Sequence, residues 1–195
     1  MLKLFIGNKT YSSWSLRGWL AAKQSGLPFE EIVVPLYDAE WDRRREGDEF
    51  APSSGKVPIL WDGEIVVWDS LAIVEYLNEK SGGDKFWPQD EAARAMARSM
   101  SAEMHSGFHQ IRNTCTMNCG LRVRVTGERP ALQAEWERVD ALWNQGLDRF
   151  GGPYLAGASF SAVDAFFAPF AFRVQTYSPP LSEPARSYVH RLLQL

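Results

Sequence analysis

Hydroxyl side chains crowd one short stretch of the sequence, YSSWSLRGWLA at residues 11–21, directly after the apolar run LKLFIG. The apolar run predicts a buried strand, and the residues that follow keep a helical spacing until Gly26 and Pro28 stop the helix. The serines therefore occupy the turn between a strand and a helix. A serine hydroxyl there can cap the helix or can hydrogen-bond a ligand, and Ser12 and Ser13 are candidates for both roles.

A second group of reactive side chains lies in EAARAMARSMSAEMHSGFHQIR, residues 91–112, which the sequence predicts to be one long helix. In such a helix His105, Phe108, His109 and Arg112 have the spacing i, i+3, i+4 and i+7 and share one face. This stripe could offer an imidazole or a guanidinium to an acidic or carbonyl substrate. It could equally face a dimer partner or solvent.

The elements that position the serines alternate between strand and helix. Apolar runs predict three further strands, at residues 29–35, 56–61 and 64–69. The dipeptide Asp62-Gly63 favours a tight hairpin turn, so the last two strands are expected to pair antiparallel. Asp69 and Ser70 supply capping side chains for the helix that comes next.

Beyond a linker that contains proline, every periodic segment predicts a helix. Ser161 and Asp164 form an S-x-x-D capping box at the start of the most apolar of these segments. The expected helices span residues 91–112, 129–150, 161–174 and 183–195. The sequence therefore predicts an α/β domain at 1–81, a linker at 82–90 and an all-helical domain at 91–195.

Composition excludes several classes of protein. The 195 residues carry a net charge of −3, from 21 basic and 24 acidic side chains, so the electrostatic footprint of a nucleic-acid-binding protein is missing. The arginines at 43–45 have acidic neighbours and predict a solvated helix face in the segment 38–50. Neither an apolar run of about 18 residues nor a signal peptide is seen, which predicts no membrane partner and a cytoplasmic location.

The sequence has two cysteines, Cys115 and Cys119, which are expected to be free thiols. No His or carboxylate cluster stands beside them at ligand spacing, so no metal site is expected.

Four motifs in order, SSWSLRGWLA, GKVPILWDG, DSLAIVEYL and FSAVDAFFAP, make the chain resemble the cytosolic glutathione S-transferases over essentially its whole length. The resemblance implies a thioredoxin-like α/β domain followed by an all-α helical bundle. It also implies glutathione as co-substrate and, by the habit of the family, a homodimer. The tryptophans at 41, 61, 68 and 87, expected to be exposed, are compatible with such an interface.

The resemblance also assigns the glutathione site. Pro58 would be cis, and Val57 would pair with the cysteinyl backbone of the ligand. Asp69 and Ser70, at a helix start, would meet the γ-glutamyl end, since free N–H groups and the helix dipole suit a carboxylate. Lys56 would reach the glycyl carboxylate.

The catalytic residue implied by the resemblance is a serine that stabilises the glutathione thiolate. SSWS is similar to the SSCS of the zeta class, which favours Ser12 and leaves Ser13 as its rival. Trp14 stands where the zeta class has a cysteine, and this difference puts the maleylacetoacetate isomerase activity of that class in doubt. Because no cysteine occurs before Cys115, disulfide chemistry through an enzyme thiol is not expected.

The expected activity is conjugation of glutathione to a small electrophile, in the manner of a detoxification enzyme. The electrophile pocket is expected between the two halves, lined by Tyr11, Trp14, His105, Phe108, His109 and Arg112. A glutathione-dependent isomerase or peroxidase, and a binding protein without catalysis, are the alternatives. Arg17 is expected to pair with an acid of the helical half. The family commonly runs on by one more helix after a segment such as SYVHRLLQL, so a truncated end is also expected.

Overall fold

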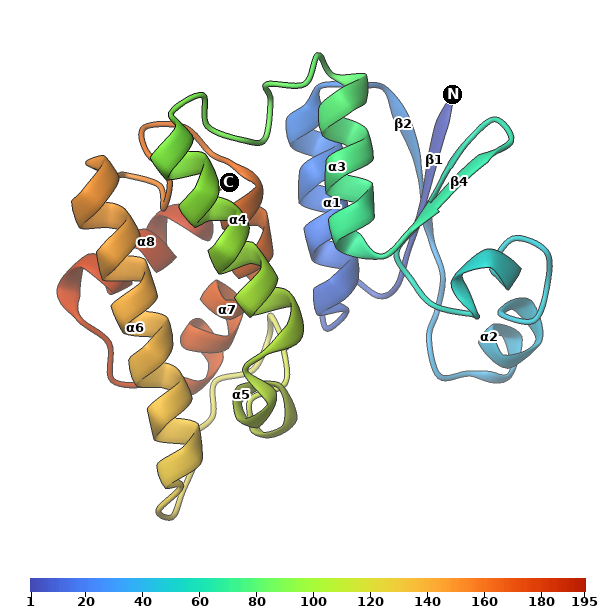
Figure 1. Ribbon diagram of the computed structural model, residues 1–195. Helices are drawn as coiled ribbons and strands as arrows, with labels where there is room; N and C mark the ends of the chain where they lie inside the picture. The colour runs from blue at the N-terminus through green and yellow to red at the C-terminus, as the bar shows by residue number, and fades with distance from the viewer. The chain divides into compact units, whose positions relative to one another are not determined.

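The computed structural model describes residues 1–195 and divides into two compact units, Met1–Phe86 and Trp87–Leu195. The first unit contains all the strands and the second is built from helices (Figure 1). Each unit has its own buried residues and is described by itself.

The first unit is organised around a four-stranded sheet of order β2-β1-β3-β4. The strands are β1 (Leu2–Ile6), β2 (Phe29–Val33), β3 (Ile59–Asp62) and β4 (Ile65–Trp68). Strand β1 pairs parallel with β2 and antiparallel with β3. The crossover from β1 to β2 is the helix α1 (Ser13–Ser25), because parallel neighbours need a long connection. The expected α/β class is confirmed.

Helices cover both sides of this sheet (Figure 1). Helix α1 and helix α3 (Ser70–Lys80) pack together on one side, while the short α2 (Ala39–Arg44) and the 3-10 turn η1 (Ala51–Ser53) lie on the other. On the second side, Phe5 and Ile59 of the sheet pack with Trp41 and Phe50. Trp41 is therefore a core residue, and the expectation that it is exposed is wrong.

The hairpin between β3 and β4 forms as expected, with one difference in its turn. Asp62 pairs with Ile65, so the two central residues are Gly63 and Glu64 and not Asp62-Gly63. Gly63 has φ = 63°, the left-handed region that glycine adopts without steric cost. Of the other tryptophans expected to be exposed, Trp87 is buried, Trp61 is partly buried, and Trp68 is exposed as expected.

The second unit contains five helices. They are α4 (Glu91–Ser106), α5 (His109–Thr114), α6 (Pro130–Phe150), α7 (Ala162–Tyr177) and α8 (Glu183–Leu192). Helix α7 is the most buried of them, and it contacts both α4 and α8. The all-helical character expected of this half is confirmed. No helix of the chain combines the length and the apolar character that crossing a membrane requires.

The expectation of one continuous helix over 91–112 is wrong. Helix α4 ends at Ser106, Gly107 is extended, and Phe108 adopts the left-handed conformation with φ = 59°. A side chain at Gly107 would lie 2.8 Å from the Glu103 carbonyl oxygen, so the bend depends on glycine. The reversal buries Phe108 against Phe170, with ring centroids 5.6 Å apart.

The expected capping box at the start of α7 is present. The Asp164 carboxylate accepts hydrogen bonds from the Ser161 backbone N–H and hydroxyl, from the Leu155 N–H and from the Tyr188 hydroxyl. One fully buried carboxylate thus ties the start of α7 to the preceding loop and to α8. Burial raises the pKa of Asp164 to about 6, although these four hydrogen bonds act in the opposite direction.

Candidate functional site

A cleft of about 710 Å³ in the first unit brings most of the predicted site residues together. Its walls come from the start of α1, the connection between β2 and α2, the loop before β3, and the start of α3. The cleft is lined by Ser12, Trp14, Leu36, Tyr37, Trp41, Arg45, Ser53, Ser54, Gly55, Lys56, Val57, Pro58, Trp68, Asp69 and Ser70.

Ser12 presents its hydroxyl at the cleft in a defined hydrogen-bond chain. The Ser15 hydroxyl oxygen accepts from the Gly7 N–H and from the Ser12 hydroxyl, each at 2.8 Å. Because hydroxyl protons rotate to suit their neighbours, the Ser12 proton can turn from Ser15 to a ligand in the cleft. Ser12 precedes α1 but does not cap it, since its side chain makes no hydrogen bond to the first N–H groups of the helix.

Ser13 lies differently from its neighbour. It is the first residue of α1, only 8% exposed, and it is not part of the cleft wall. Sequence reasoning left Ser12 and Ser13 as rivals, and the geometry distinguishes them, since Ser12 lines the cleft and Ser13 does not.

Aromatic side chains frame the cleft beside Ser12. The Trp14 ring lines the cleft and carries the Arg17 guanidinium over its face, 4.3 Å from the ring centroid. Tyr11 stacks on Tyr37 with ring centroids 6.2 Å apart and an interplanar angle of 28°. Tyr37 is 84% exposed and has φ = 68°, an uncommon backbone conformation for a bulky residue.

The opposite wall is the loop that leads into β3. The Val57-Pro58 peptide bond is cis, as the resemblance implied. Ser53 organises this loop, because its hydroxyl bonds the Phe50 and Lys56 carbonyl oxygens and accepts from the Lys56 N–H. Both Val57 and Pro58 therefore reach the cleft from a loop with internal hydrogen bonds.

The third wall is the start of α3. Asp69 has φ = 71° and its carboxylate accepts from the Leu71 N–H at 2.8 Å, which is the expected cap. The Ser70 side chain is fully buried, and its hydroxyl has no hydrogen-bond partner within the chain. An unpaired buried hydroxyl costs about 1–3 kcal/mol, so a bound ligand that bonds Ser70 recovers this energy.

The exposed rim of the cleft carries two cationic side chains, Lys56 and Arg45. Arg45 also pairs with Asp42 at 3.5 Å. Together with the N-terminal end of α3, these cations give the cleft an affinity for carboxylates at more than one position. Sequence reasoning identified Lys56 but placed Arg45 on a solvated helix face.

The helical residues proposed for an electrophile pocket do not form a single stripe, because the helix breaks between them. The guanidinium of Arg112 donates to the Met104 and Gly107 carbonyl oxygens, which are the free acceptors at the end of α4. Burial lowers the pKa of Arg112. His105 packs against Phe166 with ring centroids 5.9 Å apart, and His109 is exposed at the first position of α5.

Several cleft residues were missed by sequence reasoning. Tyr37, Trp41, Ser53, Ser54 and Trp68 reach the cleft from loops and from strand and helix ends. The positions that loops give to such side chains are set by backbone angles and not by hydrophobic periodicity. The segment APSSG, residues 51–55, was the one available signal for Ser53 and Ser54, since Ser and Gly commonly build hydrogen-bonded turns.

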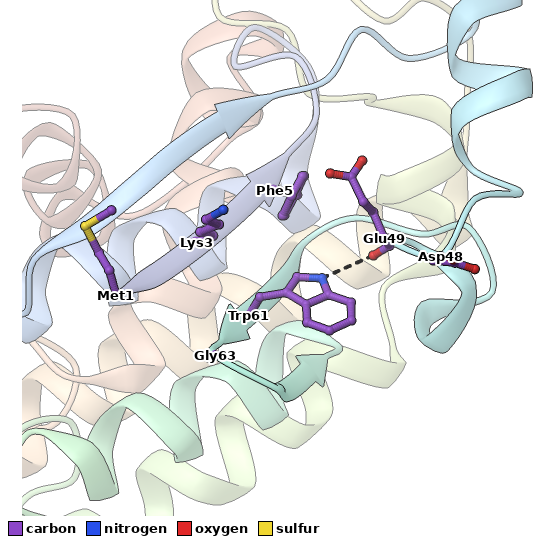
Figure 2. A pocket seen from close by; sticks show the side chains of 7 residues that line it. All are labelled: Met1, Lys3, Phe5, Asp48, Glu49, Trp61 and Gly63. Carbon is purple, nitrogen blue, oxygen red and sulfur yellow. Dashed lines mark hydrogen bonds between the residues drawn. The ribbon is translucent and has the colours of Figure 1, made fainter.

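A second hollow in the same unit lies on the sheet face that carries α2 (Figure 2). It measures about 500 Å³, and Lys3 and Trp61 face each other across β1 and β3 in its floor. The Trp61 indole N–H donates to the Glu49 carbonyl oxygen at 3.2 Å. The side chains of Asp48 and Glu49 at the rim are negatively charged, and that of Lys3 is positively charged. This mixed surface shares no residue with the cleft.

The two cysteines are free thiols, as expected. Burial raises the pKa of both Cys115 and Cys119, so neither has the depressed pKa of a reactive cysteine. No group of three or more His, Cys, Asp and Glu side chains gathers in a way that could hold a metal ion.

A mixed sheet with α1 and α3 on one side, followed by a helical unit, defines a class of two-domain proteins with a thioredoxin-like first domain. The family model for the glutathione S-transferase N-terminal domain matches residues 11–80, and the model for the C-terminal domain matches residues 126–194.

Individual relatives agree with these matches. Human glutathione S-transferase theta-2 is 30% identical over 175 residues, which cover 84% of this chain and 67% of the relative. Rat maleylacetoacetate isomerase is 26% identical over 183 residues, which cover 93% and 82%. A solved glutathione transferase homolog from Burkholderia, with bound glutathione, has a TM-score of 0.71 at 22% identity and covers 100% of this chain and 91% of its own. The chain belongs to the glutathione S-transferase family.

Proposed function

We propose that this protein is a glutathione transferase that joins the glutathione thiolate to a small electrophile. The observation that carries the proposal is the single cleft that holds Ser12, the cis Val57-Pro58 bond and the unpaired Ser70 hydroxyl. The bound glutathione of the structurally similar Burkholderia protein supports the choice of thiol.

Each end of glutathione has a complementary wall in this cleft. The γ-glutamyl carboxylate is placed at the start of α3, where Ser70 and the helix dipole favour an anion. The cysteinyl backbone pairs with the backbone of Val57 beside β3, as a peptide does when it extends a sheet. The glycyl carboxylate reaches Lys56, with Arg45 as a second cation at the rim.

This placement brings the sulfur to Ser12. A free thiol has a pKa near 8.5, so only about 3% is thiolate at pH 7, and the thiolate is the nucleophile. A hydrogen bond from the Ser12 hydroxyl favours the anion, and each unit by which the pKa falls is about 1.4 kcal/mol of stabilisation. Ser15 and the Gly7 N–H orient that hydroxyl.

A second candidate activity is a glutathione-dependent isomerisation, which the 26% identity to rat maleylacetoacetate isomerase favours. It uses the same site, since the thiolate adds to the substrate and is later released. Trp14 narrows the space beside Ser12 with a rigid indole, and this bulk favours conjugation of small substrates over isomerisation of a long dicarboxylic acid. We further propose a cytoplasmic homodimer, from the habit of the family alone.

Single substitutions of the two serines test the proposal. We expect Ser12→Ala to abolish most of the glutathione thiolate absorbance near neutral pH and to lower turnover of a generic aryl halide by about 100-fold, in the range of a lost catalytic hydrogen bond. Ser13→Ala is the matched control and should change either quantity less than about threefold. If neither variant changes thiolate absorbance or turnover, the assignment of the serine is wrong.

A glutathione-affinity column distinguishes a protein that binds glutathione from one that has kept the fold and lost the ligand. The folded wild-type protein is expected to bind the column and elute with free glutathione. A folded protein that flows through would favour a member of the family that has lost its ligand, and would contradict the proposed function.

A further inference from the structure

The second hollow of the first unit forms because the segment that contains α2 covers only part of one sheet face. Phe5 of β1 is buried there against Phe50, with ring centroids 5.4 Å apart. Lys3, two residues earlier on the same face, is exposed, and its cross-strand partner Trp61 is only partly buried. The uncovered part of the face is the hollow of about 500 Å³, a size typical of small-molecule sites (Figure 2).

Trp61 gives this hollow a large aromatic surface in a fixed orientation. Its indole N–H donates to the Glu49 carbonyl oxygen at 3.2 Å, and its ring packs against the apolar cluster that contains Phe5. The side chains of Phe5 and Met1 extend the apolar lining on either side of Lys3. Because the indole ring is already held, a flat ligand that stacks on it costs little further side-chain freedom.

Charges of opposite sign lie on the two sides of the indole ring. Figure 2 shows Lys3 on one side of Trp61, on strand β1, and Asp48 on the other side, on the segment after α2. The hollow is therefore polarised across an aromatic floor.

Neither Lys3 nor Asp48 forms an ion pair within the chain. Glu49, which also lines the hollow, is already paired with Arg44 at 3.1 Å. Glu30 is the register neighbour of Lys3 on β2, but it forms no ion pair with the Lys3 ammonium. One cation and one anion at the hollow thus remain available to a ligand.

We propose that this hollow binds a small zwitterionic aromatic compound whose carboxylate and amine lie at opposite ends of its ring. The ring lies against Trp61, the carboxylate meets the Lys3 ammonium, and the amine meets the Asp48 carboxylate. A ligand with a single charge leaves one of these two groups without a partner. The hollow shares no lining residue with the glutathione cleft, so this ligand is neither the thiol nor the electrophile of the proposed transfer.

Four compounds built on one benzene ring test the charge pattern. 4-(Aminomethyl)benzoate carries both charges at opposite ends, and its isomer phenylglycine carries both at the same end. 4-Methylbenzoate keeps only the carboxylate, and 4-methylbenzylamine keeps only the amine. We expect 4-(aminomethyl)benzoate to bind the wild-type protein at least about threefold more tightly than each of the others, the scale of one exposed ion pair. Titrations followed by ligand-observed NMR give the four Kd values.

Two substitutions at exposed positions assign the binding to this hollow. Lys3→Ala should weaken 4-(aminomethyl)benzoate and 4-methylbenzoate by about threefold and leave 4-methylbenzylamine unchanged. Asp48→Asn should weaken 4-(aminomethyl)benzoate and 4-methylbenzylamine by a similar factor and leave 4-methylbenzoate unchanged. The matched controls are Lys85→Ala and Asp84→Asn, at exposed positions that do not line the hollow, and both should keep the wild-type Kd values.

Equal Kd values for the four compounds would overturn the inference. So would an unchanged affinity for 4-(aminomethyl)benzoate in either Lys3→Ala or Asp48→Asn, or the absence of binding to the folded wild-type protein. None of these outcomes bears on the proposed transferase function, because the glutathione-affinity column tests the cleft separately.

Discussion

At the scale of single residues, Gly18 sets how closely α1 approaches Pro58. A Cβ atom at Gly18 would lie 3.1 Å from Pro58 Cγ and 3.3 Å from its Cβ, closer than most side-chain carbons come. Helix α1 thus packs directly against the Pro58 ring of the cis Val57-Pro58 peptide. We infer that this contact helps to place the Val57 backbone.

We therefore predict that Gly18→Ala weakens glutathione binding more than it weakens the fold. Alanine gains about 1 kcal/mol over glycine inside a helix, which offsets the crowding at Pro58 and keeps the free energy of unfolding within about 1 kcal/mol of the wild-type value. The shift of Val57 should raise the glutathione Kd by about tenfold, since small misplacements at a binding site are costly. Calorimetric titration and urea unfolding measure the two effects.

Gly146→Ala is the opposite case and serves as the control. Its Cβ would lie 2.6 Å from the Leu155 carbonyl oxygen in the second unit, so it should destabilise the fold and leave the affinity of the folded protein for glutathione unchanged. A Gly18→Ala variant with wild-type affinity would show that Val57 does not depend on this support.

The sequence indicated which residues belong to the site better than it indicated the role of each one. The resemblance to a known family pointed to Ser12, Lys56, Val57 and Ser70, and the structure brings these four residues to one cleft. The sequence could not decide between Ser12 and Ser13, since adjacent residues at a helix start point in directions that depend on the backbone angles of the turn.

At the scale of elements, the junction between α4 and α5 decides what Arg112 does. The break at Gly107 leaves carbonyl oxygens at the end of α4 without helical partners, and the Arg112 guanidinium bonds two of them. At the other end of this junction, the Glu135 carboxylate of α6 accepts the Gln110 and Ile111 N–H groups of α5. The Arg112 side chain thus joins α5 to the C-terminal end of α4.

We predict that Arg112→Met lowers the free energy of unfolding by about 1.5–3 kcal/mol, the range for hydrogen bonds to a charged group that is largely buried. The pKa of Arg112 is lowered by burial, so its charge is already poorly solvated and methionine removes it without a new buried charge. Urea unfolding measures the loss, and Arg149→Met, at an exposed position of α6, should change stability by less than about 0.5 kcal/mol.

Kinetics distinguish this structural role from the electrophile-binding role that helical spacing predicted for Arg112. The folded variant should keep its KM for the electrophile within about twofold of the wild-type value. A large rise in that KM, with no loss of stability, would restore the predicted role. The prediction of one continuous helix over 91–112 was wrong because Gly107 costs only about 1 kcal/mol inside a helix, so periodicity alone could not show whether the helix continues or ends.

At the scale of the whole molecule, the two-part architecture follows from the sequence more surely than any site residue does. The mixed α/β signal before residue 81 and the purely helical signal after residue 90 reflect burial patterns that persist over many residues. Packing between elements is harder to predict from the sequence. Trp41 looked exposed because charged residues surround it in sequence, yet α2 turns it into the core beside Phe50, with ring centroids 5.3 Å apart.

The second unit contains one buried carboxylate whose ionisation is linked to the stability of the fold. Asp164 joins α7 to α8 through Tyr188 and to the preceding loop through Leu155. Burial raises its pKa to about 6, against 3.8 for an exposed aspartate. The folded state therefore binds this proton more tightly than the unfolded state does. The stability that results is fully present below pH 3.8 and is lost as the pH rises through 6.

We predict that the stability difference between the wild-type protein and Asp164→Asn grows by about 1 kcal/mol when the pH falls from 7 to 5, as this shift requires. Asparagine cannot titrate, so the comparison cancels the contributions of all other carboxylates. Ser161→Ala is the matched control, because it removes one hydroxyl donor and keeps the carboxylate; it should be less stable than the wild-type protein but retain its pH dependence. Urea unfolding at both pH values, followed by tryptophan fluorescence, measures the difference. A gap that shrinks at pH 5 would mean that the four hydrogen bonds outweigh burial and hold Asp164 ionised.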